Sequence, residues 1–234
     1  MSDRTPLSTI VFDVNETLLD LSTLEPFFDR VFGNATVLRE WFAELILYSQ
    51  TVTLSGLYVP FGDLAGGVLR MVGENKQIAV QETDVSELKS LIGSMPAYGD
   101  VVPALTRLRD AGFTLVTLTN SAPSRAPTPL EKAGIAALFD DHFSVAEVGN
   151  FKPHPSTYQM VADRLGVDTS SLCMVACHIW DTIGAQSVGC QGAFIARPHN
   201  NVLHVPGVPE PDFVSQELSE LADQIVRAQM ITEL

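Results

Sequence analysis

Short apolar runs rich in β-branched residues place the strongest constraint on how this chain folds. The first run ends at Asp13, the second at Thr119-Asn120 and the third at Cys177-His178. An apolar run of strand length that ends in polar residues is typical of a buried parallel strand, whose last side chain reaches the carboxyl edge of the sheet. The sequence therefore predicts four such strands, over residues 8–13, 113–118, 172–176 and 191–195.

Helical stretches alternate with these strands. Apolar residues recur at helical spacing over residues 101–111, 129–133 and 156–165, and glycines follow the first and the last of these stretches. The alternation predicts an α/β fold, a Rossmann-like three-layer arrangement around a parallel sheet. Ligands of such folds bind beyond the carboxyl ends of the strands, so we expect the site there.

Residues 19–96 break this alternation and predict an inserted, all-helical cap domain. Four apolar residues from Leu24 to Val31 stand at i, i+3, i+4 and i+7, the spacing of one helix face. A second face continues over residues 38–46, and a glycine-rich segment, residues 55–67, is expected to interrupt the helices before a further one. The predicted domains are a core domain of residues 1–18 and 97–234 and a cap domain of residues 19–96.

Composition excludes several classes of partner. An apolar fraction of 46% with 18% charged residues is typical of a globular protein and argues against disorder. The 28 acidic residues outnumber the 14 basic ones, and the net charge of -14 repels nucleic acid and anionic membranes. An anionic substrate would also be repelled at long range, so its binding must depend on local donors such as Lys152.

The three cysteines are interpreted as reduced core thiols. Cys173 and Cys177 fall in a predicted buried strand, and the chain has no CxxC pair, which argues against zinc. The first residues show no basic segment followed by an apolar one, and no apolar run approaches 18 residues. We therefore expect a cytoplasmic protein without a membrane partner.

Polar residues gather where the fold places a ligand. Asp13, Thr119-Asn120 and Asp181 are expected at strand ends, and Lys152 in the loop before a helix. Each residue alone has a plain alternative, because an aspartate often caps a helix and a lysine is usually solvated. Their order and spacing together favour one shared site.

These residues carry a resemblance to the haloacid dehalogenase superfamily. Residues 12–18, Phe-Asp-Val-Asn-Glu-Thr-Leu, resemble its first motif; Leu118-Thr119-Asn120 resembles the second, Lys152-Pro153 the third and Trp180-Asp181 the fourth. Residues 98–105 and 151–158 resemble in particular the L-2-haloacid dehalogenase (type II) branch. The resemblance spans the whole chain and implies the superfamily's fold with its inserted cap.

Two departures from the superfamily's phosphatases affect the expected chemistry. Phosphatases of this superfamily carry an acid two residues after the nucleophile, where this chain has Asn15, and Cys177 stands where a metal-binding carboxylate would fall. Magnesium prefers oxygen ligands, so a thiol is a poor substitute. A halide leaving group needs no proton, whereas loss of a general acid slows ester cleavage by about 10²–10⁴-fold. We therefore expect neither metal nor cofactor.

The resemblance implies roles for the site residues. Asp13 would attack the halogen-bearing carbon and form an ester, Lys152 would keep Asp13 ionised, and Asp181 would position or deprotonate the water that hydrolyses the ester. Thr17 would orient the nucleophile. The expected substrate-binding residues are Asn15, Thr119, Asn120, Tyr158, Trp180, Phe42 and Phe61. For the aromatic residues Trp180, Phe42 and Phe61, plain core packing is the alternative.

Other departures concern the dehalogenase branch itself. Phe42 replaces its cap arginine, and Arg39, the nearest arginine, lies outside the motif register. Asn15-Glu16 replaces an aromatic residue and a glycine, and Cys177-His178 replaces Ser-Asn. We expect a neutral His178 imidazole to assist the water or bind the substrate. A structural hydrogen bond at the strand end is the alternative.

The predicted function is hydrolysis of small 2-haloalkanoic acids through an ester on Asp13, which gives the 2-hydroxy acid and halide. One alternative is a small-molecule phosphatase with a rebuilt metal site, which a chelator would inactivate. Another is a catalytically silent binding protein on the same fold. Retention of Asp13, Lys152 and Asp181 argues against the silent protein. The expected partner is a small-molecule substrate, and the resemblance implies a homodimer.

Overall fold

A six-stranded, all-parallel sheet forms the centre of the computed structural model, which describes residues 6–123 and 127–232. The strand order is β3-β2-β1-β4-β5-β6. In chain order the strands are β1 Thr9–Phe12, β2 Thr114–Thr119, β3 Asp141–Ser144, β4 Leu172–Ala176, β5 Gln191–Ile195 and β6 Phe213–Ser215.

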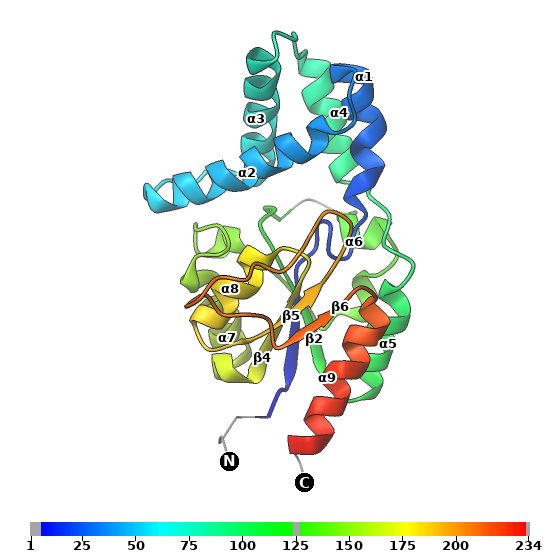
Figure 1. Ribbon diagram of the computed structural model, residues 1–234, viewed down its shortest axis with the longest axis vertical. Coiled ribbons are helices and arrows are strands. Elements are labelled where there is room, and N and C mark those ends of the chain that lie inside the picture. The colour runs from blue at the N-terminus through cyan, green and yellow to red at the C-terminus, as the bar shows by residue number, and fades with distance from the viewer. Residues whose placement is uncertain (1–5, 124–126, 233–234) are drawn as a thin grey trace.

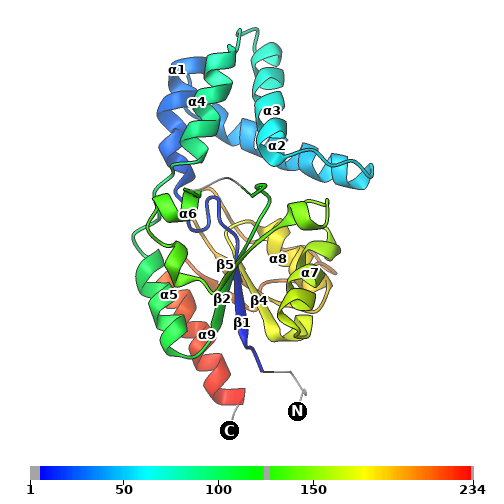
Figure 2. The same ribbon diagram turned by 180° about the vertical axis from the view of Figure 1, so that it is seen from behind.

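Helices cover both faces of the sheet and make the three layers that the sequence predicts. Helices α5 and α9 lie side by side on one face, and α7 and α8 cover the other (Figures 1 and 2). Their bounds, together with the short α6, are α5 Val101–Asp110, α6 Pro129–Lys132, α7 Pro155–Leu165, α8 Ile179–Ser187 and α9 Leu218–Thr232. Within the described residues, no helix has the length and apolar character needed to cross a membrane.

Strand β1 lies in the middle of the sheet, and every one of its residues is buried. Val11 pairs with Val116 of β2 on one side and with Met174 of β4 on the other. The ladder continues one residue beyond the strand, because the Asp13 amide donates to the Val175 carbonyl at 3.0 Å. The sheet's centre therefore fixes the backbone of Asp13 at its carboxyl edge.

The four predicted strands are confirmed as β1, β2, β4 and β5, whereas β3 and β6 escaped sequence analysis. Strand β3 begins with two exposed polar residues, and β6 has three residues, so neither shows an apolar run. The placement of Asp181 at a strand end is wrong. Asp181 lies in the first turn of α8, which points it back towards the sheet edge.

Four helices of residues 19–96 lie above the carboxyl edge of the sheet (Figure 1). They are α1 Glu25–Phe32, α2 Val37–Leu54, α3 Phe61–Asn75 and α4 Glu82–Ile92, after a short 3₁₀ turn at Leu21–Leu24. The expected glycine-rich interruption is shorter than predicted, since α3 already begins at Phe61. Gly66 lets α3 approach α4, because a Cβ there would lie 2.8 Å from a Val85 methyl group.

The chain enters and leaves this helical segment at one place. The Asp20 amide donates to the Pro96 carbonyl at 2.8 Å, and the Tyr98 amide donates to the Leu18 carbonyl at 3.0 Å. We propose that these paired crossings separate a cap domain, residues 19–96, from the core domain, as the sequence predicts.

Gly184 offers a test of the packing that holds the Lys152 loop. A Cβ at Gly184 would lie 2.5 Å from the Pro153 Cβ and 2.7 Å from the Tyr158 hydroxyl. We expect Gly184→Ala to lower the free energy of unfolding by about 1–3 kcal/mol through overpacking. The matched control, Gly67→Ala, meets nothing within 4 Å on an exposed helix face and should stabilise by ~0.5–1 kcal/mol. Urea denaturation measures both; equal effects would contradict the close contact.

Candidate active site

The ammonium group of Lys152, on the loop before α7, is the centre of the candidate site. Its side chain is fully buried, and its Nζ donates to Asp13 Oδ1 at 2.8 Å, to Asp181 Oδ2 at 2.6 Å and to the Leu118 carbonyl at 2.9 Å. The Lys152 backbone amide donates to Asn120 Oδ1 at 3.0 Å. An ammonium has three protons, so these contacts satisfy all of them.

The two carboxylates that contact Lys152 differ in how firmly they are ionised. Burial lowers the pKa of Lys152, but Asp13 and Asp181 raise it more, so the lysine stays charged. Burial raises the pKa of Asp13, but Lys152 and then His178 lower it further, and the net pKa lies well below its usual range. Burial raises the pKa of Asp181, and Lys152 only partly opposes this. Asp13 is therefore the firmly ionised member.

Thr17 holds the second oxygen of the Asp13 carboxylate. Its hydroxyl donates to Asp13 Oδ2 at 2.7 Å and accepts from the Cys177 amide at 3.0 Å. The Thr17 carbonyl in turn accepts from Arg197, at 3.2 Å from Nε and 3.1 Å from Nη2, and Asp100 holds that guanidinium through two contacts of 2.8 Å. Both carboxylate oxygens of Asp13 are thus oriented by neighbours.

Tyr158 lies behind the site. Its hydroxyl donates to Asp181 Oδ1 at 2.6 Å, and its side chain is buried against the core. It does not line the hollow in front of Asp13, so the sequence-based expectation that it would do so is wrong. The reason is that α7 carries it on the face that packs against the sheet and α8.

A small hollow lies in front of Asp13, between the core and the cap helices. Its volume is about 10 Å³, the room of one water molecule. The lining combines polar strand-end groups with apolar side chains of α2 and α3, and comprises Asp13, Asn15, Thr119, Asn120, His178, Trp180, Phe42, Ile46 and Phe61. Sequence analysis anticipated all but Ile46, which was interpreted as part of a helix face.

His178 forms one wall of this hollow and lies beside Asp13. Its Nδ1 lies 3.3 Å from Asp13 Oδ2 but is not aligned for a hydrogen bond, and its Nε2 lies 2.9 Å from Glu16 Oε2. The imidazole stacks on Trp180 with a centroid distance of 5.1 Å and packs against Phe42 at 5.3 Å. Cap and core therefore hold the ring from both sides.

The charge of His178 differs from the sequence-based expectation. Burial lowers the pKa of His178, but contacts with Cys177, Asp13 and Glu16 raise it more, and the net pKa lies well above the usual value. Burial also raises the pKa of the Cys177 thiol, so that group is neutral near pH 7 and the carboxylates supply the attraction. These contacts favour a charged imidazole in the resting protein, whereas the sequence predicts a neutral one.

Glu16 and Arg39 are the functional candidates that sequence reasoning missed. Glu16 is 1% exposed, and its carboxylate pairs with His178 on one side and with Arg39 Nη1 of α2 on the other. Burial raises the pKa of Glu16, but His178 and Arg39 lower it more. The sequence did contain a sign of this pair, because Glu16 and His178 both depart from the branch pattern. An acid and a base that replace two uncharged residues of a pattern can form an ion pair with each other.

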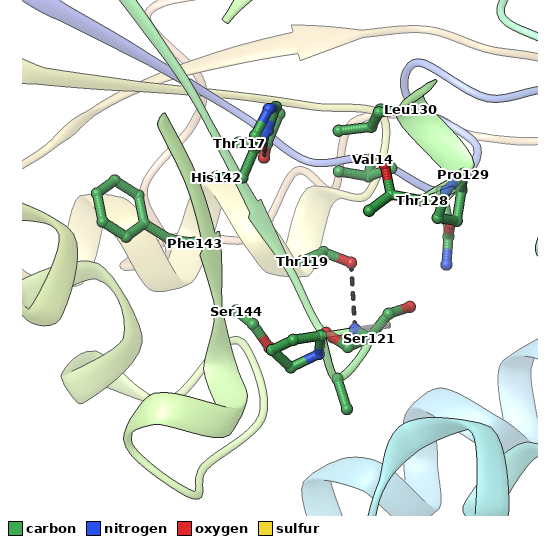
Figure 3. A pocket seen from close by; sticks show the side chains of 13 residues that line it. Val14, Thr117, Thr119, Ser121, Thr128, Pro129, Leu130, His142, Phe143 and Ser144 are labelled. Atoms are coloured by element: carbon green, nitrogen blue, oxygen red, sulfur yellow. Dashed lines mark hydrogen bonds between the residues drawn. The ribbon is translucent and has the colours of Figure 1, made fainter. Parts of the chain in front are cut away.

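A second, larger hollow of about 190 Å³ lies beside the first, between β2, β3 and α6 (Figure 3). It shares Asn15 and Thr119 with the hollow in front of Asp13. Its polar groups bond to one another, as in the 3.1 Å contact from the Ser121 amide to the Thr119 hydroxyl, so the lining presents mainly apolar surface.

Comparison with known proteins identifies the family. The model of haloacid dehalogenase-like hydrolases matches residues 7–189. The chain belongs to this family of hydrolases. It is 33% identical to (S)-2-haloacid dehalogenase 1 of a Pseudomonas species (strain CBS-3), over 95% of this chain and 98% of the relative. It is 29% identical to (S)-2-haloacid dehalogenase 4A of Burkholderia cepacia, over 83% and 85% of the two chains.

Solved structures of haloacid dehalogenases share the fold. A dehalogenase with an intermediate complex is 27% identical, with a TM-score of 0.85, over 94% of this chain and 97% of that one. The L-2-haloacid dehalogenase of Xanthobacter autotrophicus with chloropropionic acid covalently bound is 23% identical, with a TM-score of 0.84, over 94% and 98%. At 23% identity, the comparison with the Xanthobacter autotrophicus structure shows a shared fold and no more.

The magnesium site of the superfamily's phosphatases does not fit the residues present here. Asp13, Cys177 and His178 offer one oxygen, one sulfur and one nitrogen within 4.8 Å of one another. Magnesium requires oxygen ligands in an octahedron, and Lys152 already occupies the other oxygen of Asp13. The donor set therefore argues against magnesium in this member of the haloacid dehalogenase family.

The charge of His178 is measurable by NMR of its ring as a function of pH. We expect its pKa to lie above 6.5, and Glu16→Gln to lower it because one carboxylate partner is removed. A raised folded-state pKa means that the charged ring stabilises the fold fully below pH ~6.5 and that this contribution is lost as pH rises through the folded pKa. Titration at or below the ordinary value would contradict the arrangement.

Proposed function

We propose that this hydrolase removes halide from small 2-haloalkanoic acids through a covalent ester on Asp13. The observation that carries the proposal is an ionised carboxylate at the end of β1, held by Lys152 and facing a hollow with apolar walls. The names of the relatives, (S)-2-haloacid dehalogenases, support the same chemistry. So does the chloropropionic acid covalently bound in the Xanthobacter autotrophicus enzyme.

In the first half-reaction an Asp13 oxygen attacks the carbon that carries the halogen. A carbon–oxygen bond forms, the carbon–halogen bond breaks, and the halide leaves with its electron pair. The rings of Phe42, Phe61 and Trp180 exclude water from the bound carbon skeleton. The His178 imidazolium faces the same hollow and supplies the positive charge that an anionic substrate or a departing halide needs.

The second half-reaction depends on a change at His178. Ester formation removes the negative charge of Asp13, which lies 3.3 Å from His178 Nδ1, so the pKa of the imidazole falls. The ring releases its Nδ1 proton to solvent, while the Nε2–H group stays hydrogen-bonded to Glu16, and the Nδ1 lone pair then faces the ester. Nδ1 accepts one proton from water as the water oxygen attacks the ester carbonyl. The bond between the carbonyl carbon and the substrate oxygen breaks, the 2-hydroxy acid leaves with the second water proton, and the Asp13 carboxylate and the His178 imidazolium are restored.

Asp181 is less suited to activate this water. One of its oxygens accepts from Lys152 and the other from Tyr158, and its side chain is fully buried away from the hollow. These contacts support a positioning role, in which Asp181 holds the lysine that keeps the nucleophile ionised. His178 and Glu16 therefore take the role that the family resemblance implied for Asp181.

The sulfur and nitrogen donors beside Asp13 support a reaction that needs no magnesium, so a chelator should leave halide release intact. Loss of activity with a chelator would favour the phosphatase alternative instead.

We also propose a cytoplasmic homodimer that does not bind nucleic acid, on the family resemblance and the net charge of -14.

One turnover in ¹⁸O-labelled water tests the function. With enzyme in excess over 2-chloropropionate, water attacks the ester carbonyl, so the label should appear in the peptide that contains Asp13. Mass spectrometry of that peptide and of the 2-hydroxy acid measures the outcome. Label in the hydroxy acid alone would mean that water attacks the substrate directly. Absence of halide release from any short 2-haloacid would reject the proposed function.

His178→Ala tests the second half-reaction separately. The ester should still form, more slowly because the His178 charge is lost, and should hydrolyse more slowly still, so that a burst of halide is followed by a steady rate lower by about 10²-fold or more. Rapid-quench measurement of halide separates the two phases. The matched control is His142→Ala, which removes a histidine of the neighbouring hollow and should leave both phases unchanged. An unchanged steady rate in His178→Ala would make that residue a structural one.

A further inference from the structure

We propose that Asp13, Cys177 and His178 form a binding site for a soft or borderline divalent metal ion such as zinc, and that such an ion inhibits the enzyme. One ligand atom from each residue lies within 4.8 Å of the other two, and all three residues are buried. Oxygen, sulfur and nitrogen together are a donor set that zinc accepts and magnesium does not. The inference rests on the proposed function for the inhibition but not for the binding.

The orientation of His178 is the independent observation that points to a ligand. Its Nδ1 is buried without a hydrogen-bond partner in the described structure, although the residue is only 5% exposed. Its other nitrogen faces the Glu16 carboxylate at 2.9 Å. Histidines that bind metals usually donate their second N–H to a carboxylate in this way, which fixes the tautomer and directs the free lone pair at the metal.

The distances are close to those of a tetrahedral ion. Zinc–nitrogen and zinc–oxygen bonds of about 2.0–2.2 Å place two such ligands roughly 3.3 Å apart at a tetrahedral angle. The observed separation of His178 Nδ1 and Asp13 Oδ2 is 3.3 Å. The Cys177 sulfur lies within 4.8 Å of both atoms, and the zinc–sulfur bond, about 2.3 Å, is the longest of the three. The hollow in front of Asp13 and His178 provides the route of entry and the fourth position.

Charge and proton balance are favourable. Binding releases the Cys177 thiol proton and the Nδ1 proton of the imidazolium to solvent, which leaves a thiolate and a neutral ring as ligands. The negative charges of the thiolate, Asp13, Glu16 and Asp181 then equal the positive charges of the ion, Lys152 and Arg39. No buried charge is left unpaired, which would otherwise oppose the binding.

Such an ion would disable both half-reactions at once. It takes the Asp13 lone pair that attacks the substrate and the His178 lone pair that accepts the proton from water. The interpretation of the three cysteines as core thiols then does not hold for Cys177, which the fold brings together with His178 and the distant Asp13. A chelator would raise the activity of a zinc-loaded preparation, the opposite of its effect on a metal-dependent phosphatase.

Direct binding tests the site without using activity. Titration with zinc, followed by calorimetry, should give one ion per chain, and cobalt should give the absorption of a thiolate–cobalt bond. Cys177→Ala and Cys177→Ser should abolish that absorption, whereas Cys173→Ala, which removes a buried cysteine of the preceding strand β4, should retain it. Glu16→Gln should weaken zinc binding by about 10–100-fold.

Halide release then links occupancy to inhibition. Zinc should abolish the halide release of the wild type, and a chelator should restore it, while Cys177→Ala should resist zinc relative to its own zinc-free rate. Zinc binding that persists in Cys177→Ala, or no binding by the folded wild type, would overturn the site. Binding without inhibition would overturn the inhibitory role. Zinc binding in a protein that releases no halide would instead reject the proposed function and leave the metal site standing.

Discussion

The burial of one ammonium group organises this molecule. Lys152 is fully buried, and a buried charge is tolerated only when its partners replace water. Those partners come from the end of β1, the end of β2 and the start of α8, so the lysine joins three segments that are distant in sequence. Removing the charge would leave two carboxylates close together without a cation, the situation in which a buried pair becomes strongly destabilising. The stability of the fold and the ionisation of Asp13 thus depend on the same contact.

The central strands could be predicted from the sequence because their burial restricts which residues they contain. Strands β1 and β4 are buried on both faces, which requires the continuous apolar runs that single them out. Strand β3 lies at the sheet edge with exposed polar residues and therefore leaves no such pattern. Parallel topology brings strand ends to one edge, and this explains why Asp13, Lys152 and Asn120 were anticipated as neighbours.

The remainder of the site depends on contacts that no periodicity encodes. Arg39 meets Glu16 only because α2 crosses above the loop after β1, and the angle of that crossing is a property of the packed cap. The face of α7 that carries Tyr158 was likewise settled by packing against α8. The charge of His178 followed from two carboxylates, one of which was not recognised as a partner. Orientation between segments, rather than residue type, was the missing information.

The backbone of Glu16 has a consequence for how this enzyme varies. Its φ of 65° lies in the left-handed region, where a residue other than glycine costs ~1–3 kcal/mol. Glycine would relax the backbone but leave Arg39 and His178 without their shared acceptor. Backbone strain and charge pairing therefore act in opposite directions at this one position, and the loss of a buried ion-pair partner outweighs the strain. Glutamate can occupy a strained backbone position here because its carboxylate, held between two cations, returns more stability than the backbone loses.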